Sequence, residues 1–379
     1  MAINKKLRVK RGATILKNEE AAVMELFKQI QQPDMEASIF FCSSRYDLEK
    51  LGNILKNTFS CPLIGCTTSG EISSEGYQDG GIMGVSISSD ELKLHSHVIS
   101  PLKGFGFMEA QMLSESIKSE LVFSNRFQKD KMFGFLMIDG LSNMEERIIA
   151  SLYNQFEWIS IAGGSAGDDM QLIETKVYSD GKFISDAAVF TVIETTLPFY
   201  IFKTQHFIPT EKKLVITDAD PSQRLVKEIN AEQAAQEYAN ALGIKVTDLN
   251  PTVFSTHPLM LKIGDNWYVR SIQKVNDDGS LSFFCAIDVG LVMTLGQCGN
   301  ILTDLKELFE KISQEIPDSA LIIGCDCVSR KREMIEFGIM KEIGNLLKDK
   351  NFIGFSTYGE QFNSVHVNQT LTGVAIGGR

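Results

Sequence analysis

A short glycine-rich pattern that occurs three times places the tightest limit on how this chain can fold. Residues 64–71 (IGCTTSGE) match residues 353–360 (IGFSTYGE), and in both copies a Gly-Val-x-Ile sequence follows nineteen residues after the first glycine. Residues 161–168 (IAGGSAGD) form a weaker third copy with the same glycine-then-acid ending. Internal repetition of this kind predicts related supersecondary units.

Each copy follows the same kind of sequence. An apolar run ends in a short polar tip, and a stretch with apolar residues at helical spacing then leads to the glycine pattern; the runs are residues 38–42, 133–138 and 321–325. A helix between two short apolar runs favours parallel pairing of the two strands, because parallel strands need a crossover connection. We therefore predict an α/β fold built from repeated strand-helix-strand units.

The sequence between residues 191 and 295 has a different texture. Residues 230–233 (NAEQ) resemble a capping box and predict a helix that ends at Gly243. Three apolar stretches separated by turn residues then predict a β meander over residues 259–263, 267–275 and 281–287. We place the domain boundary between residues 195 and 220, which divides the chain into residues 1–205 and 206–379.

Composition excludes several classes of protein. The 379 residues carry a formal net charge of −11, which disfavours binding to nucleic acid or anionic lipid. No apolar run approaches the ~18 residues of a membrane span. The seven cysteines form no regular framework and are expected to be free thiols. We expect a cytoplasmic protein that binds neither nucleic acid nor membrane.

No motif selects a chemical reaction, and we predict that the protein is not an enzyme. The glycine patterns lack the endings of a P-loop or a dinucleotide-binding turn, so their glycines are expected to serve turns or close strand contacts. Glu71, Asp168 and Glu360 end the three copies; they are either paired carboxylates for acid–base work or, as we favour, caps of turns. Cys298, Cys325 and Cys327 resemble no standard zinc pattern.

The five histidines are few enough to consider one by one. His95 and His97 share one face of a strand-like segment and are expected to be solvated. His206 lies at the predicted domain junction, where structural and ligand roles are equally favoured. His257 precedes a proline at the start of the meander, and His366 has apolar neighbours in the third unit. From the residues alone, a structural role is favoured for His257 and His366.

The chain resembles the FIST sensory domains over nearly its whole length. The N-terminal part of that family is matched by the glycine patterns at residues 64–71 and 162–168. The C-terminal part is matched by four short motifs, at residues 228–230, 257–259, 268–272 and 355–361. The resemblance implies two FIST parts, the second containing the meander, and it leaves no room for a fused output module.

Two motifs narrow the resemblance. Residues 366–370 (HVNQT) and 268–272 (YVRSI) are similar to those of bacterial nitric oxide sensing proteins. Such proteins bind haem b and regulate a separate histidine kinase or diguanylate cyclase. The resemblance therefore implies a haem-binding nitric oxide sensor that acts through protein–protein contact. Whether the chain forms a homodimer is left open.

The cofactor residues follow from the chemistry that such a sensor needs. Haem iron in a gas sensor takes one protein ligand, usually imidazole, and leaves the other side apolar. His257 and His366 are the candidate iron ligands and His206 is the next choice. Arg270 is expected to pair with a propionate, because its planar fork matches a carboxylate. The candidate lining consists of Phe283 with Phe284 and Met260, together with Tyr268 and Tyr358 from the family motifs.

Two alternatives remain from the sequence. One is a haem-independent FIST module that senses a small metabolite, such as an amino acid, between its two halves. The other is an enzyme that uses a carboxylate such as Glu360. We rank them after the haem sensor, in that order.

Overall fold

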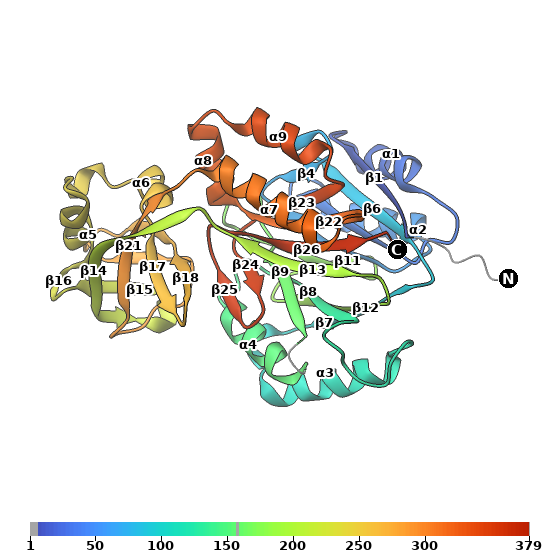
Figure 1. Ribbon diagram of the computed structural model, residues 1–379, viewed down its shortest axis with the longest axis horizontal. Coiled ribbons are helices and arrows are strands. Elements are labelled where there is room, and N and C mark those ends of the chain that lie inside the picture. The colour runs from blue at the N-terminus through green and yellow to red at the C-terminus, as the bar shows by residue number, and fades with distance from the viewer. Residues whose placement is uncertain (1–6, 157–158, 379) are drawn as a thin grey trace.

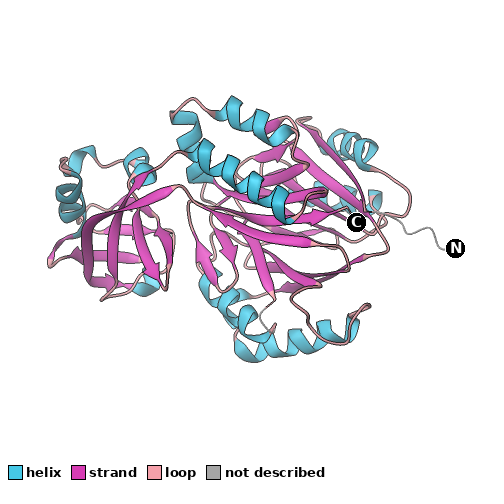
Figure 2. Cartoon of the chain, viewed as in Figure 1, coloured by secondary structure: helices cyan, strands magenta, loops and turns pink. Residues whose placement is uncertain are grey.

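The computed structural model describes residues 7–156 and 159–378, which form two unequal parts (Figure 1). The larger part, here called the body, contains residues 7–204 and 300–378 and has three six-stranded sheets. The smaller part, here called the insert, contains residues 207–298 and has one eight-stranded sheet. Strands and helices are mixed throughout the body, as an α/β fold requires (Figure 2).

Three strand-helix-strand units form the centre of the body, as the repeat predicts. In each unit the two strands pair in parallel. The first unit is β2 (Ala37–Ser43), α2 (Leu48–Thr58) and β3 (Leu63–Thr68); the second is β8 (Met132–Ile138), α4 (Glu145–Gln155) and β9 (Ser160–Ser165); the third is β22 (Ser319–Cys327), α8 (Val328–Glu336), α9 (Met340–Lys348) and β23 (Phe352–Thr357).

Each unit sends a hairpin into the sheet of another unit. The hairpin that follows β3 pairs with β23, the one that follows β9 pairs with β3, and the one that follows β23 pairs with β9. The exchange is therefore cyclic and ties the three sheets together. The hairpins are β4 (Glu71–Ser73) with β5 (Gly76–Gln78), β10 (Val177–Ser179) with β11 (Lys182–Ile184), and β24 (Glu360–Phe362) with β25 (Val365–Val367).

Two antiparallel strands complete each sheet of the body. A return strand lies beside the central strand of each unit, and an outer strand pairs with it. The return strands are β6 (Ile82–Ser88), β12 (Ala188–Thr195) and β26 (Leu371–Gly377), and their outer neighbours are β1 (Arg8–Thr14), β7 (Leu92–Ile99) and β13 (Phe199–Thr204).

The three sheets enclose one shared apolar core. Phe41, Phe135 and Phe355, one from each unit, all belong to it. The outer faces are covered by helices: α1 (Glu19–Ile30) and α2 on the first sheet, α3 (Phe107–Glu120) and α4 on the second, and α7 (Ile301–Glu315) with α8 and α9 on the third. Among the described residues, no helix is both long and apolar enough to cross a bilayer.

Glycine is required where parallel strands touch. A Cβ at Gly163 would collide with the carbonyl oxygen of Leu136, and one at Gly354 with that of Gly324. Both pairs are neighbours in register across a parallel ladder. The recurring glycines therefore allow close approach of strands rather than cradling a phosphate.

The insert contains the predicted meander and two short helices. Its strands are β14 (Phe207–Asp220), β15 (Leu225–Ile229), β16 (Glu232–Gln233), β17 (Leu259–Ile263), β18 (Asn266–Arg270), β19 (Ile272–Val275), β20 (Leu281–Phe283) and β21 (Val292–Cys298), with helices α5 (Ala234–Leu242) and α6 (Pro251–Thr256). The stretch predicted as one strand over residues 267–275 divides at Ser271, because β18 pairs with β17 whereas β19 pairs with β20.

The predicted start of the insert's first helix is wrong. Asn230 and Ala231 both have positive φ angles and form the turn between β15 and β16, and the helix begins at Ala234. Its end is as predicted, with Gly243 at φ 74° accepting the left-handed C-cap position. The Asn-Ala pair signals a tight hairpin turn here, since Asn tolerates the left-handed region.

Candidate ligand site

The three glycine patterns meet at one end of the body. The amide of Ser69 donates to the carbonyl of Ser356 (2.9 Å), and the amide of Ser165 donates to that of Gly359 (2.7 Å). The amide of Gly167 donates to the carbonyl of Thr67 (3.0 Å), which completes the contacts among the three copies. Parallel strands present their carboxyl ends at the same edge, where α/β folds place ligand sites.

The acids that end the first and third copies have matching partners. Glu71 accepts a hydrogen bond from the Thr68 hydroxyl (2.7 Å), and Glu360 accepts one from the Thr357 hydroxyl (2.5 Å). The second carboxyl oxygen of each accepts a backbone amide of the return segment. Burial raises the pKa of each group to about 8. These bonds identify both glutamates as caps of their own turns.

The acid of the second copy holds a different structure, a segment that we call the strap (residues 168–175). The Asp168 carboxylate accepts the amides of Leu172 and Ile173 at 2.9 and 2.6 Å, and it accepts the Tyr358 hydroxyl. Asp169, Met170 and Leu172 all have φ angles near 60°. Three non-glycine residues in the left-handed region within four positions indicate local strain, which proteins concentrate at functional sites.

The insert docks against the body beside the strap. Arg224 of the insert reaches Glu145 and Glu146 of α4 at 2.9 and 2.7 Å. Arg270 donates to the carbonyl of His366 in β25 (3.2 Å). In Figure 1, β24 and β25 lie on the side of the body that faces the insert. The junction therefore buries charged groups from both parts.

A small cavity of about 20 Å³ lies at this junction. Its lining comes from the strap, from the start of α8, from the insert and from the third repeat, and it includes Met170, Val328, Ser271, Phe284, Tyr358 and Asn368. Asn368 is 1% exposed, and neither its amide nitrogen nor its amide oxygen has a hydrogen-bond partner. The hydroxyl of Ser271 is also buried without a partner.

More unpaired polar atoms surround the cavity lining. They are Nε of Arg270, Nε2 of His366, and the side-chain oxygens of Gln361 and Gln369. Buried polar atoms are nearly always paired in native proteins, and each exception indicates water, an ion or a ligand. The concentration of such atoms at one junction makes it the candidate functional site.

His366 presents a neutral imidazole to this region. Burial lowers the pKa of His366 to about 4, so the ring is uncharged at neutral pH. Its Nδ1 lies 3.4 Å from the amide nitrogen of Gln361, which also donates to Ser165. Because an amide nitrogen can only donate, Nδ1 is the acceptor and Nε2 carries the hydrogen. The unpaired Nε2 is therefore a hydrogen-bond donor.

The other predicted cofactor residues are dispersed. Tyr268 lies on β18, where the ammonium of Lys203 sits 4.4 Å from its ring centroid. Phe283 is buried in the core of the insert. His257 caps the end of α6, partly exposed, with Nδ1 2.9 Å from the Thr256 hydroxyl. Of the predicted cofactor residues, Arg270, His366, Tyr358 and Phe284 are at the junction.

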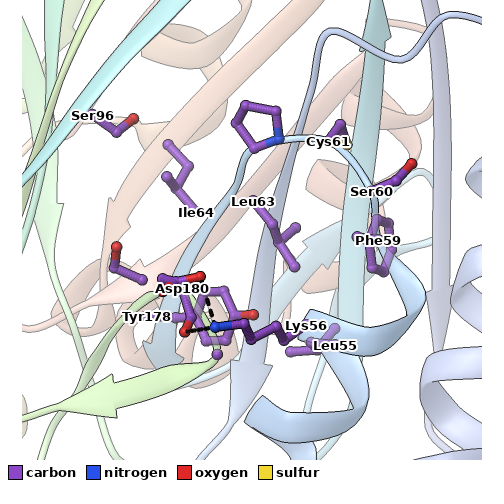
Figure 3. A pocket seen from close by; sticks show the side chains of 13 residues that line it. Leu55, Lys56, Phe59, Ser60, Cys61, Leu63, Ile64, Ser96, Tyr178 and Asp180 are labelled. Atoms are coloured by element: carbon purple, nitrogen blue, oxygen red, sulfur yellow. Dashed lines mark hydrogen bonds and ion pairs between the residues drawn. The ribbon is translucent and has the colours of Figure 1, made fainter.

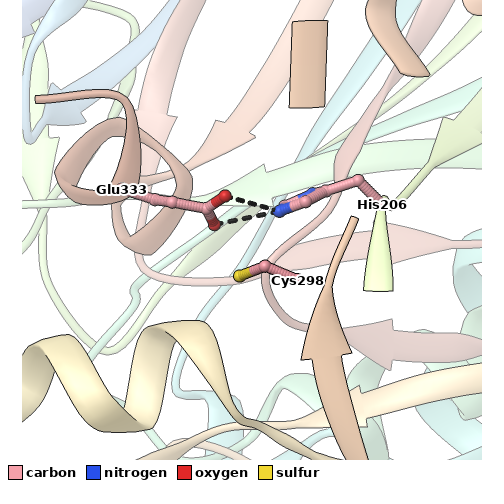
Figure 4. Close-up of side chains that lie close together, drawn as sticks. All are labelled: His206, Cys298 and Glu333. Atoms are coloured by element: carbon pink, nitrogen blue, oxygen red, sulfur yellow. Dashed lines mark hydrogen bonds and ion pairs between the residues drawn. The ribbon is translucent and has the colours of Figure 1, made fainter. Parts of the chain in front are cut away.

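His95 and His206 are both buried beside carboxylates. The expectation that His95 is solvated is wrong, because its side chain is buried and Nε2 lies 3.3 Å from Glu194. His206 is also buried and has both ring nitrogens engaged. Its Nε2 lies 2.7 Å from Glu333 (Figure 4). Its Nδ1 lies 3.1 Å from Nη1 of Arg330.

The junction cavity is too small for a haem in this conformation. An iron-bound imidazole usually donates its second ring N–H to an acceptor, whereas Nδ1 of His366 faces a donor. The cavity volume of about 20 Å³ has room for one water molecule but not for a porphyrin. His257 is not among the residues that line this cavity.

Larger surface clefts, including the following two, are open to solvent. One, of about 410 Å³, lies between α2, β3 and the hairpin of β10 and β11, and Lys56 and Asp180 form an ion pair at 3.0 Å across it (Figure 3). The other, of about 270 Å³, shares Met170 and Val328 with the junction cavity. The second cleft thus lies directly outside the strap.

Sequence reasoning missed Ser271, Asn368 and Gln361 as site residues. All three lie within the motifs that carry the family resemblance, and that membership is the one signal that was present. A lone serine or amide side chain has no spacing pattern that announces a ligand. Their lack of partners depends on how the insert packs, which no local pattern encodes.

Comparison with known families finds two adjacent matches, which meet inside the insert. The FIST N domain profile matches residues 36–232, and the FIST C domain profile matches residues 234–363. No curated protein matches the sequence. FIST domains are sensory domains of signal transduction. The chain belongs to the FIST family of sensory proteins.

Proposed function

We propose that this FIST protein senses a small polar molecule at the junction between the body and the insert. The observation that carries the proposal is the set of unpaired, buried polar atoms around the cavity, above all both amide atoms of Asn368. Leaving such atoms unpaired costs about 1–3 kcal/mol each. A ligand that pairs with them gains this energy and favours the conformation in which insert and body are docked.

The route into the site runs past the strap. The cavity is the size of one water molecule, so a metabolite enters only if the strap or the insert moves. Met170 lines both the cavity and the outer cleft, and it lies in the strained part of the strap. Ligand binding would thereby change the exposed strap surface that a separate signalling enzyme reads. A histidine kinase or diguanylate cyclase is the partner we propose.

Haem and nitric oxide sensing is the second candidate. The observation in its favour is the neutral, buried imidazole of His366, whose Nε2 lacks a partner. Haem binding would require the Gln361 amide to turn its oxygen toward Nδ1 and the junction to open. The absorption spectrum separates the two candidates, because bound haem gives a Soret band that shifts with nitric oxide.

The experiment is a thermal-unfolding screen of the full chain with free amino acids and related small polar metabolites, and with haem in parallel. A ligand at one hundred times its Kd stabilises the fold by about 2.7 kcal/mol, which raises Tm by several degrees. Asn368→Ala and Ser271→Ala should abolish the shift while leaving the unliganded Tm nearly unchanged, because neither atom has a protein partner to lose.

Ser179→Ala is the matched control, since Ser179 lines the open cleft of Figure 3 and not the junction. It should keep the full ligand-induced shift. A ligand that stabilises Asn368→Ala as much as the native chain would refute the site. A Soret band that His366→Ala removes would instead favour the haem sensor.

A further inference from the structure

A second cluster of polar side chains lies at the base of the insert, where the chain enters and leaves it. His206 immediately precedes β14, and Cys298 ends β21, so the two sit on adjacent strands. Glu333 reaches them from α8 of the body. Nε2 of His206, Sγ of Cys298 and a carboxylate oxygen of Glu333 all lie within 4.8 Å of one another (Figure 4).

The cluster is enclosed on one side and accessible on the other. The side chains of His206 and Glu333 are each 1% exposed, whereas Cys298 is only partly buried. The Cys298 thiol donates to the carbonyl of Thr256 at 3.2 Å. Cys298 is therefore the member of the cluster most exposed to solvent.

We propose that His206, Cys298 and Glu333 bind one Zn²⁺ ion, with water as the fourth ligand. Imidazole nitrogen, thiolate sulfur and carboxylate oxygen are the three donor types that zinc takes in proteins. Thiolate and carboxylate together neutralise the charge of the ion. This site is separate from the ligand site proposed above and does not depend on it.

Only small side-chain movements are needed to reach zinc geometry. With Zn–N near ~2.0 Å and Zn–S near ~2.3 Å, ligand atoms around a tetrahedral ion lie roughly 3.5 Å apart. The Nε2–Oε1 distance of 2.7 Å would widen by less than about 1 Å, and the sulfur, now up to 4.8 Å away, would approach by roughly 1 Å. Rotations about side-chain bonds of Cys298 and Glu333 supply movements of this size.

The protons must balance when the ion binds. Arg330 can only donate, so Nδ1 of His206 now accepts and Nε2 carries the hydrogen that Glu333 receives. Zinc takes the lone pair of Nε2 after the ring hydrogen moves to Nδ1, and it takes Sγ after the thiol releases its proton to solvent. One proton is released for each ion bound.

The new hydrogen on Nδ1 displaces the guanidinium of Arg330. Nη1 then turns toward Asp304, whose Oδ2 has no hydrogen-bond partner and lies 4.0 Å away. Nε of Arg330 keeps its bond to Asp326 at 2.7 Å. Asp304 and Asp326 thus hold the charge of Arg330 while the ion occupies the other face of His206.

Such an ion would join both ends of the insert to α8. His206 and Cys298 are the two crossing points, and α8 contributes Val328 and Ser329 to the lining of the junction cavity. Metal binding would therefore fix the hinge about which the insert moves relative to the cavity. Binding energy from a buried ion becomes stability of the docked arrangement.

The test is a titration of Co²⁺ into the chelator-treated full chain, followed by absorbance. We expect one Co²⁺ per chain and a thiolate-to-cobalt charge-transfer band. Cys298→Ser should abolish the band, and His206→Gln and Glu333→Gln should each weaken Co²⁺ binding at least tenfold. Cys61→Ser, at a half-buried thiol beside Ser38, is the matched control and should leave the titration unchanged.

Thermal unfolding with Zn²⁺ supplies an independent readout. Zn²⁺ should raise the Tm of the native chain and of Cys61→Ser but not that of Cys298→Ser. Absence of a charge-transfer band in the native chain, or a band that persists in Cys298→Ser, would overturn the site. If circular dichroism shows that Cys298→Ser is unfolded, native-like affinity in His206→Gln and Glu333→Gln would overturn it equally.

Discussion

The first and third copies of the repeat differ from the second in what their terminal acid supports. Glu71 and Glu360 each accept a threonine hydroxyl and a backbone amide at equivalent positions and hold regular turns, and Glu360 also accepts the Thr370 hydroxyl. Asp168 instead accepts amides from the strap, whose residues include three in the left-handed region. The first and third copies therefore share one turn structure, and the second copy has a different one.

The strap, in which the second copy differs from the others, lies beside the candidate ligand site. The strap lines the junction cavity through Met170 and Leu172, and the turn of Glu360 adds Tyr358, whereas the turn of Glu71 contributes no lining residue. Strain that survives in a folded protein is held by surrounding contacts, here the bonds of Asp168 and those of Asp169 to Ser43 and Ser44. The repeated scaffold thus differs from the strap, which its hydrogen bonds hold in a strained conformation.

The pH dependence of stability tests the scaffold and has the largest expected effect. The pKa of Glu71 and of Glu360 is raised from 4.5 to about 8 by burial, with nearby carboxylates adding to the shift. The unfolded chain therefore loses these protons first as pH rises. The free energy of unfolding should fall between pH 4.5 and 8, by several kcal/mol per group, and level off above pH 8.

Urea unfolding at several pH values measures this fall. Glu71→Gln and Glu360→Gln should each flatten it by a similar amount, because glutamine stays neutral. Glu310→Gln, at an exposed position on α7, serves as the control and should leave the slope unchanged. Unequal effects of the first two substitutions would break the equivalence of the first and third copies.

Replacing the acid at the end of each copy with alanine should give the next largest change in the free energy of unfolding. Glu71→Ala leaves the amide of Gly81 without its acceptor, and Glu360→Ala does the same to Thr370. Each should lower the free energy of unfolding by about 2–3 kcal/mol. Asp168→Ala should cost about 1 kcal/mol, since the freed strap amides turn toward water. Equal costs for all three, measured by urea unfolding at pH 6, would contradict the comparison.

Much of the scaffold could be predicted because its signals are local. Apolar runs, helical spacing and recurring glycines lie within each unit, and they specify strands, helix and parallel pairing. The exchange of hairpins could not be predicted. A strand of three residues such as β4 carries too few side chains to specify that its partner is β23, far along the sequence.

The candidate sites depend on packing between distant segments. His366 stands out in the sequence as a lone histidine among apolar residues, but the unpaired state of its Nε2 follows only from what surrounds it. His206 and Cys298 come together because the chain leaves and re-enters the body at one place. Sequence reasoning grouped Cys298 with Cys325 and Cys327 because it had no means to see that crossing point.

Glycine substitution in the strap should give the smallest effect and tests the strain directly. Met170 has a φ angle of 66°, where glycine is favoured over alanine. Met170→Gly should therefore be more stable than Met170→Ala by about 1 kcal/mol in urea unfolding. Met112, an exposed methionine on α3, is the matched control, because glycine in a helix should be less stable than alanine by about 1 kcal/mol.

The informative result is the difference in unfolding free energy between the glycine and alanine variants, which should be positive at Met170 and negative at Met112. Glycine and alanine both remove the methionine side chain, so its lost contacts cancel in the comparison at each site and the backbone conformation dominates the difference. If Met170→Gly proves no more stable than Met170→Ala, the strap carries no strain and the second copy differs from the others only in sequence. If the signs differ, the strap stores energy that its opening would release, which is what a segment gating the junction cavity requires.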